Sequence, residues 1–273
     1  GPLGQGHTFA VGAAIAAKFL AAHTGNKSFE KEKIYTYISD GGIQEEISQG
    51  AGRLAGYLGL DNLVMFYDSN GIQLSTTCED VSAEDTAMKY RAWNWNVLEI
   101  DGNDCEAIRG ALLAAHEEHN RPTLIIGKCV MGKGCLRADG TSYENDCGTH
   151  GCALGEGAYE NTIKNLGGNP GNPFVVWKET ETLYAERKLE LKELVAQRKK
   201  EENEWAAANP EKARKLEDWF ANRLPEIDWE TIEQKPGKAT RVGSQIVLGR
   251  LAEKVENMVC SSADLCNSDK TDG

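Results

Sequence analysis

The sequence has no long apolar segment and no excess of basic residues. Its 273 residues include 30 Lys and Arg against 42 Asp and Glu, a formal net charge of −12. No apolar run approaches the roughly 18 residues that a membrane-spanning helix needs, and nothing resembles a secretory leader. Because nucleic-acid phosphates are bound by clustered Lys and Arg, the acidic balance argues against a nucleic-acid binder. We therefore expect a soluble globular protein that binds neither membrane nor nucleic acid.

Cysteine pairs and the common glycine-rich fingerprints are also absent. The eight cysteines include no C-x-x-C pair, as is typical of free thiols in a reducing cytoplasm, so we expect a cytoplasmic protein. Neither G-x-G-x-x-G after a strand nor G-x-x-x-x-G-K-[ST] occurs, which excludes the usual dinucleotide and P-loop sites. Cys147, His150 and Cys152 are a possible zinc set, although no fourth ligand is evident and the spacing is unfamiliar.

Short apolar segments alternate with helical patterns in the first part of the chain. Strands are predicted at 34–39, 62–69, 96–101 and 123–130, and helices at 12–20, 43–58, 83–93 and 105–119. Strands that are apolar throughout and alternate with helices form parallel sheets covered on both faces. We therefore predict a doubly wound α/β domain with a mostly parallel sheet.

Composition divides the chain into three parts. From 178 to about 235 it is dense in charge and nearly free of glycine, which predicts solvent-exposed helices, one of them starting at Asn209 and Pro210. From Ala239 the pattern returns to a helix at 242–254 and a short apolar run at 257–260. We predict a ligand-binding domain at 1–177, a helical linker at 178–238 and the start of a second α/β domain, with its first strand, at 239–273.

Polar residues follow two successive predicted strands. Asp40-Gly41-Gly42 comes after the first, and Asn70 lies 30 positions later (70 minus 40), where the second ends. A strand, helix and strand occupy about 30 residues, so both side chains are expected at the carboxyl edge of the sheet, where α/β sheets bind ligands. Carboxylate and amide oxygens, with a backbone carbonyl near Ile72, suit Mg²⁺ or Ca²⁺. Asp-Gly and Asn-Gly are each common in ordinary turns, so either dipeptide alone indicates no more than a turn. The occurrence of both at this spacing favours a cation site.

Six segments resemble the motifs of transketolases, a family of thiamine diphosphate-dependent enzymes. They occur in the family's order along nearly the whole chain: GPLGQG at 1–6, SDGGIQEE at 39–46, YDSNGI at 67–72, THGCALG at 149–155, ATR at 239–241 and SSADLCNSDKT at 261–271. The first four letters also match the remnant of a cleaved purification tag. Because they continue into the rest of the motif, we expect them to belong to the protein.

The resemblance implies a cofactor site in a thiamine diphosphate-binding fold. Asp40, Asn70 and the carbonyl of Ile72 would bind the Mg²⁺ or Ca²⁺ that anchors the diphosphate. Gly41 would contact the diphosphate through its backbone, ahead of a helix whose N-terminal amides favour an anion. The first three residues would lie along the cofactor, with the third against its aminopyrimidine ring: Gly1, Pro2 and Leu3.

The resemblance also implies substrate and subunit contacts. His150 would lie between the cofactor phosphate and the sugar and assist proton transfer, with a structural loop histidine as the alternative. Glu45 would lie at the contact that links the two active sites of a homodimer. Arg241 and Ser268 would bind the phosphate of a sugar phosphate, and for Arg241 a plain surface cation is the alternative.

The implied activity is transfer of a two-carbon ketol unit from a ketose phosphate to an aldose phosphate, through a thiamine diphosphate carbanion, in the pentose phosphate pathway. The family's catalytic glutamate lies in its pyrimidine-binding domain and further histidines lie upstream, so we expect these 273 residues, as a fragment, to be inactive. Two alternatives are an enzyme of the deoxyxylulose phosphate synthase type and a non-catalytic binding or regulatory relative. The chain departs from the family at Ser39, Ser69 and Cys152, and more freely over 132–148.

Overall fold

Four parallel strands form the sheet of the first part of the chain in a computed structural model that describes residues 2–271. The strands are β1 Ile34–Ser39, β2 Leu63–Ser69, β3 Asn96–Asp101 and β4 Thr123–Lys128, in the order β1-β2-β4-β3. The register pairs Ser39 with Asp68, so β1 and β2 end side by side. The predicted α/β class with a parallel sheet is confirmed.

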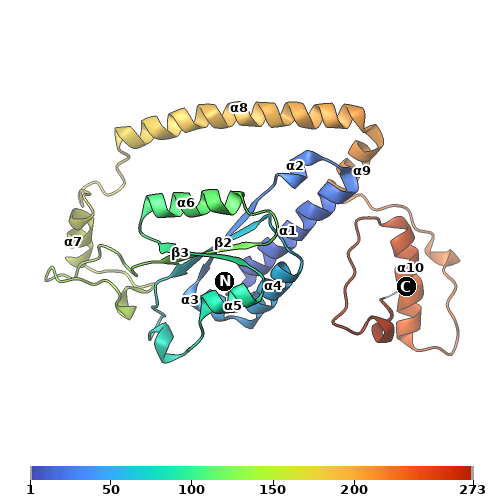
Figure 1. Cartoon of the computed structure of the whole chain (residues 1–273), viewed down its shortest axis with the longest axis horizontal. Helices are drawn as coiled ribbons and strands as arrows, with labels where there is room; N and C mark the ends of the chain where they lie inside the picture. The colour runs from blue at the N-terminus through green and yellow to red at the C-terminus, as the bar shows by residue number, and fades with distance from the viewer. Residues whose placement is uncertain (1, 272–273) are drawn as a thin grey trace. The chain divides into compact units, whose positions relative to one another are not determined.

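Helices pack on both faces of this sheet. The first part of the chain contains α1 Gln5–Thr24, α2 Lys27–Glu30, α3 Asp40–Gln44, α4 Glu46–Tyr57, α5 Thr86–Ala92, α6 Cys105–His116 and α7 Ala158–Asn165, and the helical residues of the core come from α1, α3, α4, α5 and α6. Figure 1 shows α6 on one side of the sheet and α4 and α5 on the other. Along the strand order, the connections from β1 to β2 and from β2 to β3 move toward the β3 edge of the sheet, whereas the connection from β3 to β4 moves back toward β1. Right-handed crossovers therefore place α6 on the opposite face.

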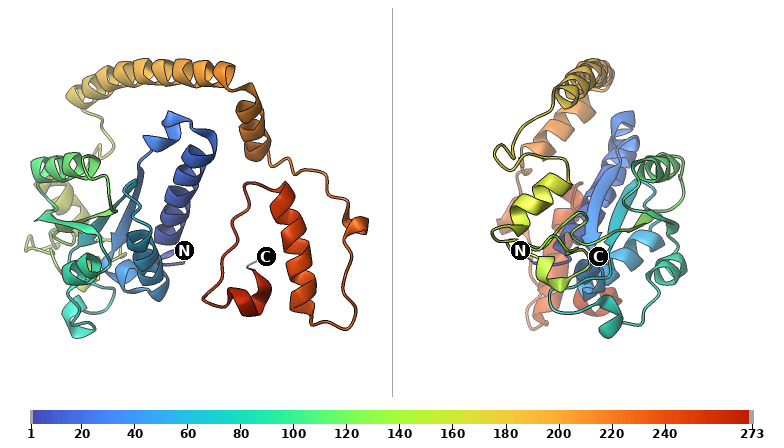
Figure 2. Two further views of the ribbon diagram at one scale, coloured as in Figure 1. Left: turned by 45° about the vertical axis from the view of Figure 1, so that its right-hand side comes forward. Right: turned by 90° about the vertical axis from the view of Figure 1, so that its left-hand side faces the viewer.

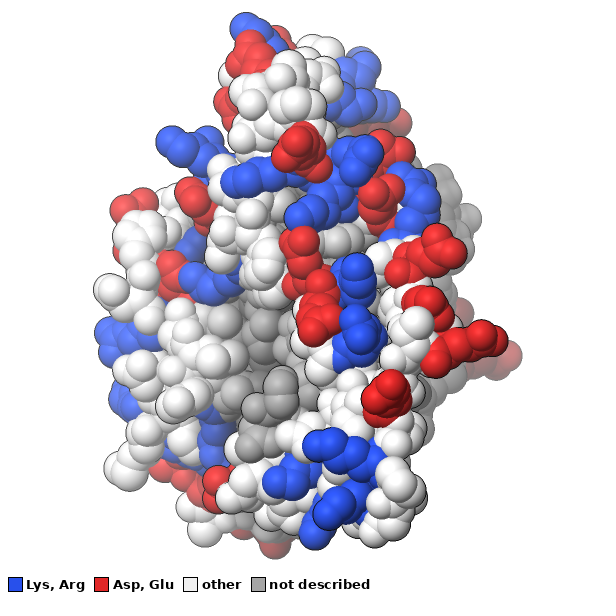
Figure 3. All heavy atoms as spheres, turned by 90° about the vertical axis from the view of Figure 1, so that its right-hand side faces the viewer, with Lys and Arg blue, Asp and Glu red and all other residues white. Residues whose placement is uncertain are grey.

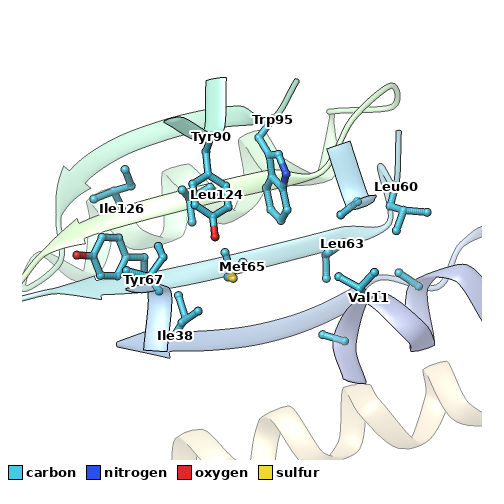
Figure 4. Packing of buried hydrophobic residues seen from close by; sticks show 14 of the residues in the cluster. Val11, Ile38, Leu60, Leu63, Met65, Tyr67, Tyr90, Trp95, Leu124 and Ile126 are labelled. Carbon is cyan, nitrogen blue, oxygen red and sulfur yellow. The ribbon is translucent and has the colours of Figure 1, made fainter. Parts of the chain in front are cut away.

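The strand β2 lies at the centre of the hydrophobic core. Leu63, Met65 and Tyr67 belong to the cluster that packs under α1, α4 and α5, whereas Val64 belongs to the cluster under α6, as the alternation of strand side chains requires. Figure 4 shows the larger cluster, in which Tyr67 lies at the end of the row formed by Leu63 and Met65. The packed core therefore extends to the carboxyl end of β2.

The chain divides into two units, residues 1–199 and 200–273. The helix α8 Lys178–Ala208 runs from the first into the second, which also holds α9 Pro210–Phe220, α10 Thr240–Lys254 and a π-helical turn at Cys266–Lys270. Figure 2 shows α8 as one continuous helix followed by α9. The predicted start of a helix at Pro210 is confirmed. The predicted division at 177/178 and 238/239 stays a prediction.

The first strand expected within 239–273 is not found in the described residues of that part. The described part of the second unit, residues 200–271, contains helices and irregular segments without a strand. A strand needs a hydrogen-bonded neighbour, and an apolar run without one remains irregular.

Charged side chains of both signs cover the surface. Figure 3 shows basic and acidic side chains interspersed on the face that it presents. In α8 no side chain is buried, and pairs such as Arg187 with Glu190 lie one turn apart along the helix. In the part of the chain that the structure describes, no helix is both long and apolar enough to cross a membrane.

Candidate active site

The ends of β1 and β2 bring Asp40 and Asn70 together, as their spacing predicts. The Oδ2 atom of Asp40 accepts hydrogen bonds from the backbone amides of Asn70 at 3.1 Å and Gly71 at 3.0 Å. Its Oδ1 atom accepts the hydroxyl of Tyr67 at 2.5 Å. Asp40 is only 3% exposed, so its carboxylate is held in a defined orientation by three donors.

The turn after β2 supplies two more oxygen atoms. The Oδ1 atom of Asn70 accepts the amide of Ile72 at 3.0 Å, and its Nδ2 atom donates to Asp68 at 3.2 Å. Among the backbone hydrogen bonds of the described residues, none ends on the carbonyl of Ile72. Each of these oxygens, like Oδ1 of Asp40, retains a lone pair. The donor set of carboxylate, amide and carbonyl therefore fits a hard cation such as Mg²⁺ or Ca²⁺.

The segment Pro2-Leu3-Gly4 packs beside the same edge of the sheet. Gly4 has φ +83°, and a Cβ there would lie 2.7 Å from Oγ of Ser48. The Cδ2 atom of Leu3 lies 3.3 Å from the position that a Cβ on Gly41 would take. Only glycine fits both the positive φ and the close contact at position 4. The segment is thus a packed part of the fold beside Gly41; the predicted contact of Gly1 lies outside the described residues.

The single helix predicted at 43–58 is wrong in its start and its continuity. The helix α3 begins at Asp40, because Oγ of Ser39 accepts the amide of Gly42 at 3.3 Å and caps it. Glu45 is extended, with φ −63° and ψ 131°, and separates α3 from α4. Gly41 therefore lies inside a five-residue helix, rather than before a long one, and Glu45 is exposed at the break.

His150 follows a short turn in the loop after β4. The Asp146 carboxylate accepts the amide of Gly148 at 2.8 Å and pairs with Arg137 at 2.7 Å. The thiol of Cys147 donates to the carbonyl of Thr76 at 3.4 Å. That contact ties the loop carrying the half-buried His150 to the turn that follows Asn70.

The zinc set suggested by Cys147, His150 and Cys152 does not form. Within residues 2–271, no three or more His, Cys, Asp or Glu side chains are grouped to hold a metal ion. Two free thiols near the candidate site also have raised pKa values, those of Cys78 and Cys129. Burial and the nearby Asp40 raise the pKa of Cys78, and burial and Asp68 raise that of Cys129 to about 11.

In the second unit, Arg241 and Ser268 lie together. The Nη1 atom of Arg241 is 3.5 Å from Oγ of Ser268, and both side chains are exposed. A guanidinium beside a hydroxyl suits a phosphate group. The structure thus brings together the two residues that the sequence assigns to substrate phosphate.

Two residues of the site had no role in the sequence interpretation. Tyr67 donates to Asp40, and its pKa is raised by burial and then by that hydrogen bond, so the hydroxyl stays protonated. Lys128, at the end of β4, donates to Oγ of Ser69 at 3.0 Å. The serine that departs from the family motif at position 69 is therefore hydrogen-bonded. Both residues line an open pocket of about 480 Å³ beside Asp40. Strand alternation, which places 67 and 69 on one face, is a signal for Tyr67, whereas the contact of Lys128 depends on the register between β2 and β4.

A parallel α/β sheet with carboxylate and amide oxygens at two adjacent strand ends fits the thiamine diphosphate-binding class of proteins. The family model described as "Transketolase, thiamine diphosphate binding domain" matches residues 1–225. The chain therefore belongs to the transketolase family. The match includes the opening segment, which favours protein sequence over a tag remnant.

Individual relatives agree with the family. The chain is 36% identical to a transketolase of Bacillus subtilis, over 99% of this chain and 41% of the relative, and 32% identical to a dihydroxyacetone synthase of Pichia angusta, over 97% and 38%. It is similar to the crystal structure of a Pichia stipitis transketolase in complex with sedoheptulose-7-phosphate, with TM-score 0.88, 30% identity and coverage of 99% and 40%. The chain thus spans about two fifths of the length of these proteins.

Proposed function

We propose that this chain is the diphosphate-binding part of a transketolase that moves a two-carbon ketol unit from a ketose phosphate to an aldose phosphate. The observation that carries the proposal is the buried Asp40 beside Asn70 at adjacent strand ends, within the segment that matches the family. The sugar phosphate named for the Pichia stipitis complex supports the substrate class. The parent enzyme would be a cytoplasmic homodimer of the pentose phosphate pathway.

The residues of this chain would hold and orient the reactants. Asp40, Asn70 and the Ile72 carbonyl would bind Mg²⁺ or Ca²⁺, and the backbone of Gly41 would contact the diphosphate. Once bound, thiamine diphosphate supplies the electron sink for breaking and forming carbon–carbon bonds. Pro2 and Leu3, with Gly1, line the cofactor.

Other residues act on the sugar and at the subunit contact. His150 would lie between the cofactor phosphate and the sugar and would assist proton transfer there. Arg241 and Ser268 bind the substrate phosphate by charge and hydrogen bonding. Glu45, exposed between α3 and α4, is available to the second subunit. Relatives named transketolase and dihydroxyacetone synthase favour this activity over the deoxyxylulose phosphate synthase type.

Calorimetric titration of the 273-residue chain with thiamine diphosphate and Mg²⁺ tests the proposal. We expect the unchanged chain to bind thiamine diphosphate and Asp40→Ala to bind it at least about 100-fold more weakly. Loss of a direct metal ligand should cost more affinity than loss of a residue that only supports one. Asp228→Ala, an exposed aspartate of the second unit, should bind normally. Equal binding by Asp40→Ala would refute the metal assignment, and no binding by the unchanged chain would favour the non-catalytic alternative.

A further inference from the structure

Tyr67 is fixed in the core with only its hydroxyl at the site. It is 7% exposed and belongs to the cluster that also contains Ile38, Met65 and Ile126. Figure 4 shows its ring among these side chains at the end of β2. Because packing restricts the ring, the hydroxyl oxygen has a fixed place from which to donate to Asp40.

The hydrogen bonds of Asp40 restrict how its carboxylate can meet a cation. A carboxylate has about four lone-pair positions, two on each oxygen. The amides of Asn70 and Gly71 occupy those of Oδ2, and the Tyr67 hydroxyl occupies one on Oδ1. These three hydrogen bonds leave one position, on Oδ1, that a cation can take in competition with the nearby thiol of Cys78, so the carboxylate can bind through a single oxygen.

We propose that Tyr67 is a positioning residue of the cation site, whose hydroxyl turns the Asp40 carboxylate so that one oxygen faces the metal, and that this geometry favours Mg²⁺ over Ca²⁺. Mg²⁺ requires a near-octahedral shell and takes one or two carboxylates, whereas Ca²⁺ accepts irregular shells and bidentate carboxylates. The inference rests on the proposed cation-dependent binding of thiamine diphosphate.

The test compares the apparent affinity of the full chain for thiamine diphosphate at fixed Mg²⁺ and at fixed Ca²⁺, by titration calorimetry. Tyr67→Phe removes one oxygen atom and keeps the ring. We expect about 10- to 100-fold weaker binding with Mg²⁺, the usual effect of losing a supporting hydrogen bond to a metal ligand. The loss with Ca²⁺ should be smaller, so the ratio of the two affinities falls. Tyr37→Phe, at a 79% exposed tyrosine of β1, should leave both affinities unchanged.

The ratio separates positioning from a loss of fold. A variant that is merely less stable, as a circular dichroism melt would reveal, lowers both affinities by one factor; an unchanged ratio therefore overturns the inference. If Asp40→Ala loses binding and Tyr67→Phe does not, Tyr67 has no positioning role while the proposed function stands. If the unchanged chain binds with neither cation, both proposals fail.

Discussion

His7 is a buried polar residue whose side chain is left without hydrogen bonds. It is 1% exposed, and neither ring nitrogen has a hydrogen-bond partner among the described residues. Its ring meets Trp95 edge to face, with centroids 6.2 Å apart. Burial lowers the pKa of His7 from 6.5 to about 4, so the folded protein holds a neutral imidazole at neutral pH.

Replacing this side chain should stabilise the protein and change its response to acid. The pKa of His7 is lower in the folded than in the unfolded protein. The free energy of unfolding is therefore unaffected by protonation of His7 above pH 6.5 and decreases as the pH falls toward 4, by roughly 3 kcal/mol. His7→Leu should remove that loss and raise the free energy of unfolding at neutral pH by about 1–3 kcal/mol, the cost of unsatisfied buried polar atoms. Urea unfolding across this pH range measures both. The exposed His119→Gln serves as control, and an unchanged pH slope in His7→Leu would contradict the argument.

The helix α4 packs against the turn before β3 through its glycines. A Cβ on Gly56 would lie 1.7 Å from the carbonyl oxygen of Trp93, and the indole of Trp95 donates to the carbonyl of Gly52 at 2.8 Å. These backbone contacts hold α4 close to the sheet, directly after the α3 segment that carries Asp40. The position of the site thus depends on α4, which has room only for glycine at Gly56 and little room for a side chain at Gly52, where the helix faces Trp93 and Trp95.

Two glycines of the same helix should respond in opposite ways to alanine. Gly56→Ala should lower the free energy of unfolding by about 1–3 kcal/mol or more, because the turn must move away. Gly50→Ala, where nothing lies within 4 Å of the new methyl group, should raise it by about 1 kcal/mol through helix propensity. Urea denaturation of both variants measures the difference. Destabilisation of similar size at both positions would show that the packing of α4 is not the cause.

At the scale of the whole molecule, the chain spans 38–41% of its curated relatives. The cofactor-binding family model matches residues 1–225, and about three fifths of the length of these relatives has no counterpart among the 273 residues. We therefore expect the purified chain to bind thiamine diphosphate without transferring ketol units. An assay that follows aldose phosphate conversion checks this, with the Bacillus subtilis transketolase as the active reference. Turnover by the chain that Asp40→Ala abolishes would show that these residues suffice.

Sequence alone determined the class of the fold and much of the candidate site. The strands at 34–39 and 96–101 have their predicted limits. Both are short segments with β-branched and other apolar residues, which favour the extended conformation. The pairing of Asp40 with Asn70 followed from a spacing that matches one strand, helix and strand. The break at Glu45 was missed because the local sequence gives no signal for it. What accompanies the break is a tertiary contact, the packing of Gly4 against the junction of α3 and α4.

Only the tertiary structure decided how the site is supported. The hydrogen bonds from Tyr67 to Asp40 and from Lys128 to Ser69 join residues 27 and 59 positions apart, and the orphaned ring of His7 arises where α1 meets Trp95. Periodicity along the chain shows which face a residue occupies but not which atoms meet across strands. Those contacts depend on register and packing, which the assembled sheet and its helices alone determine.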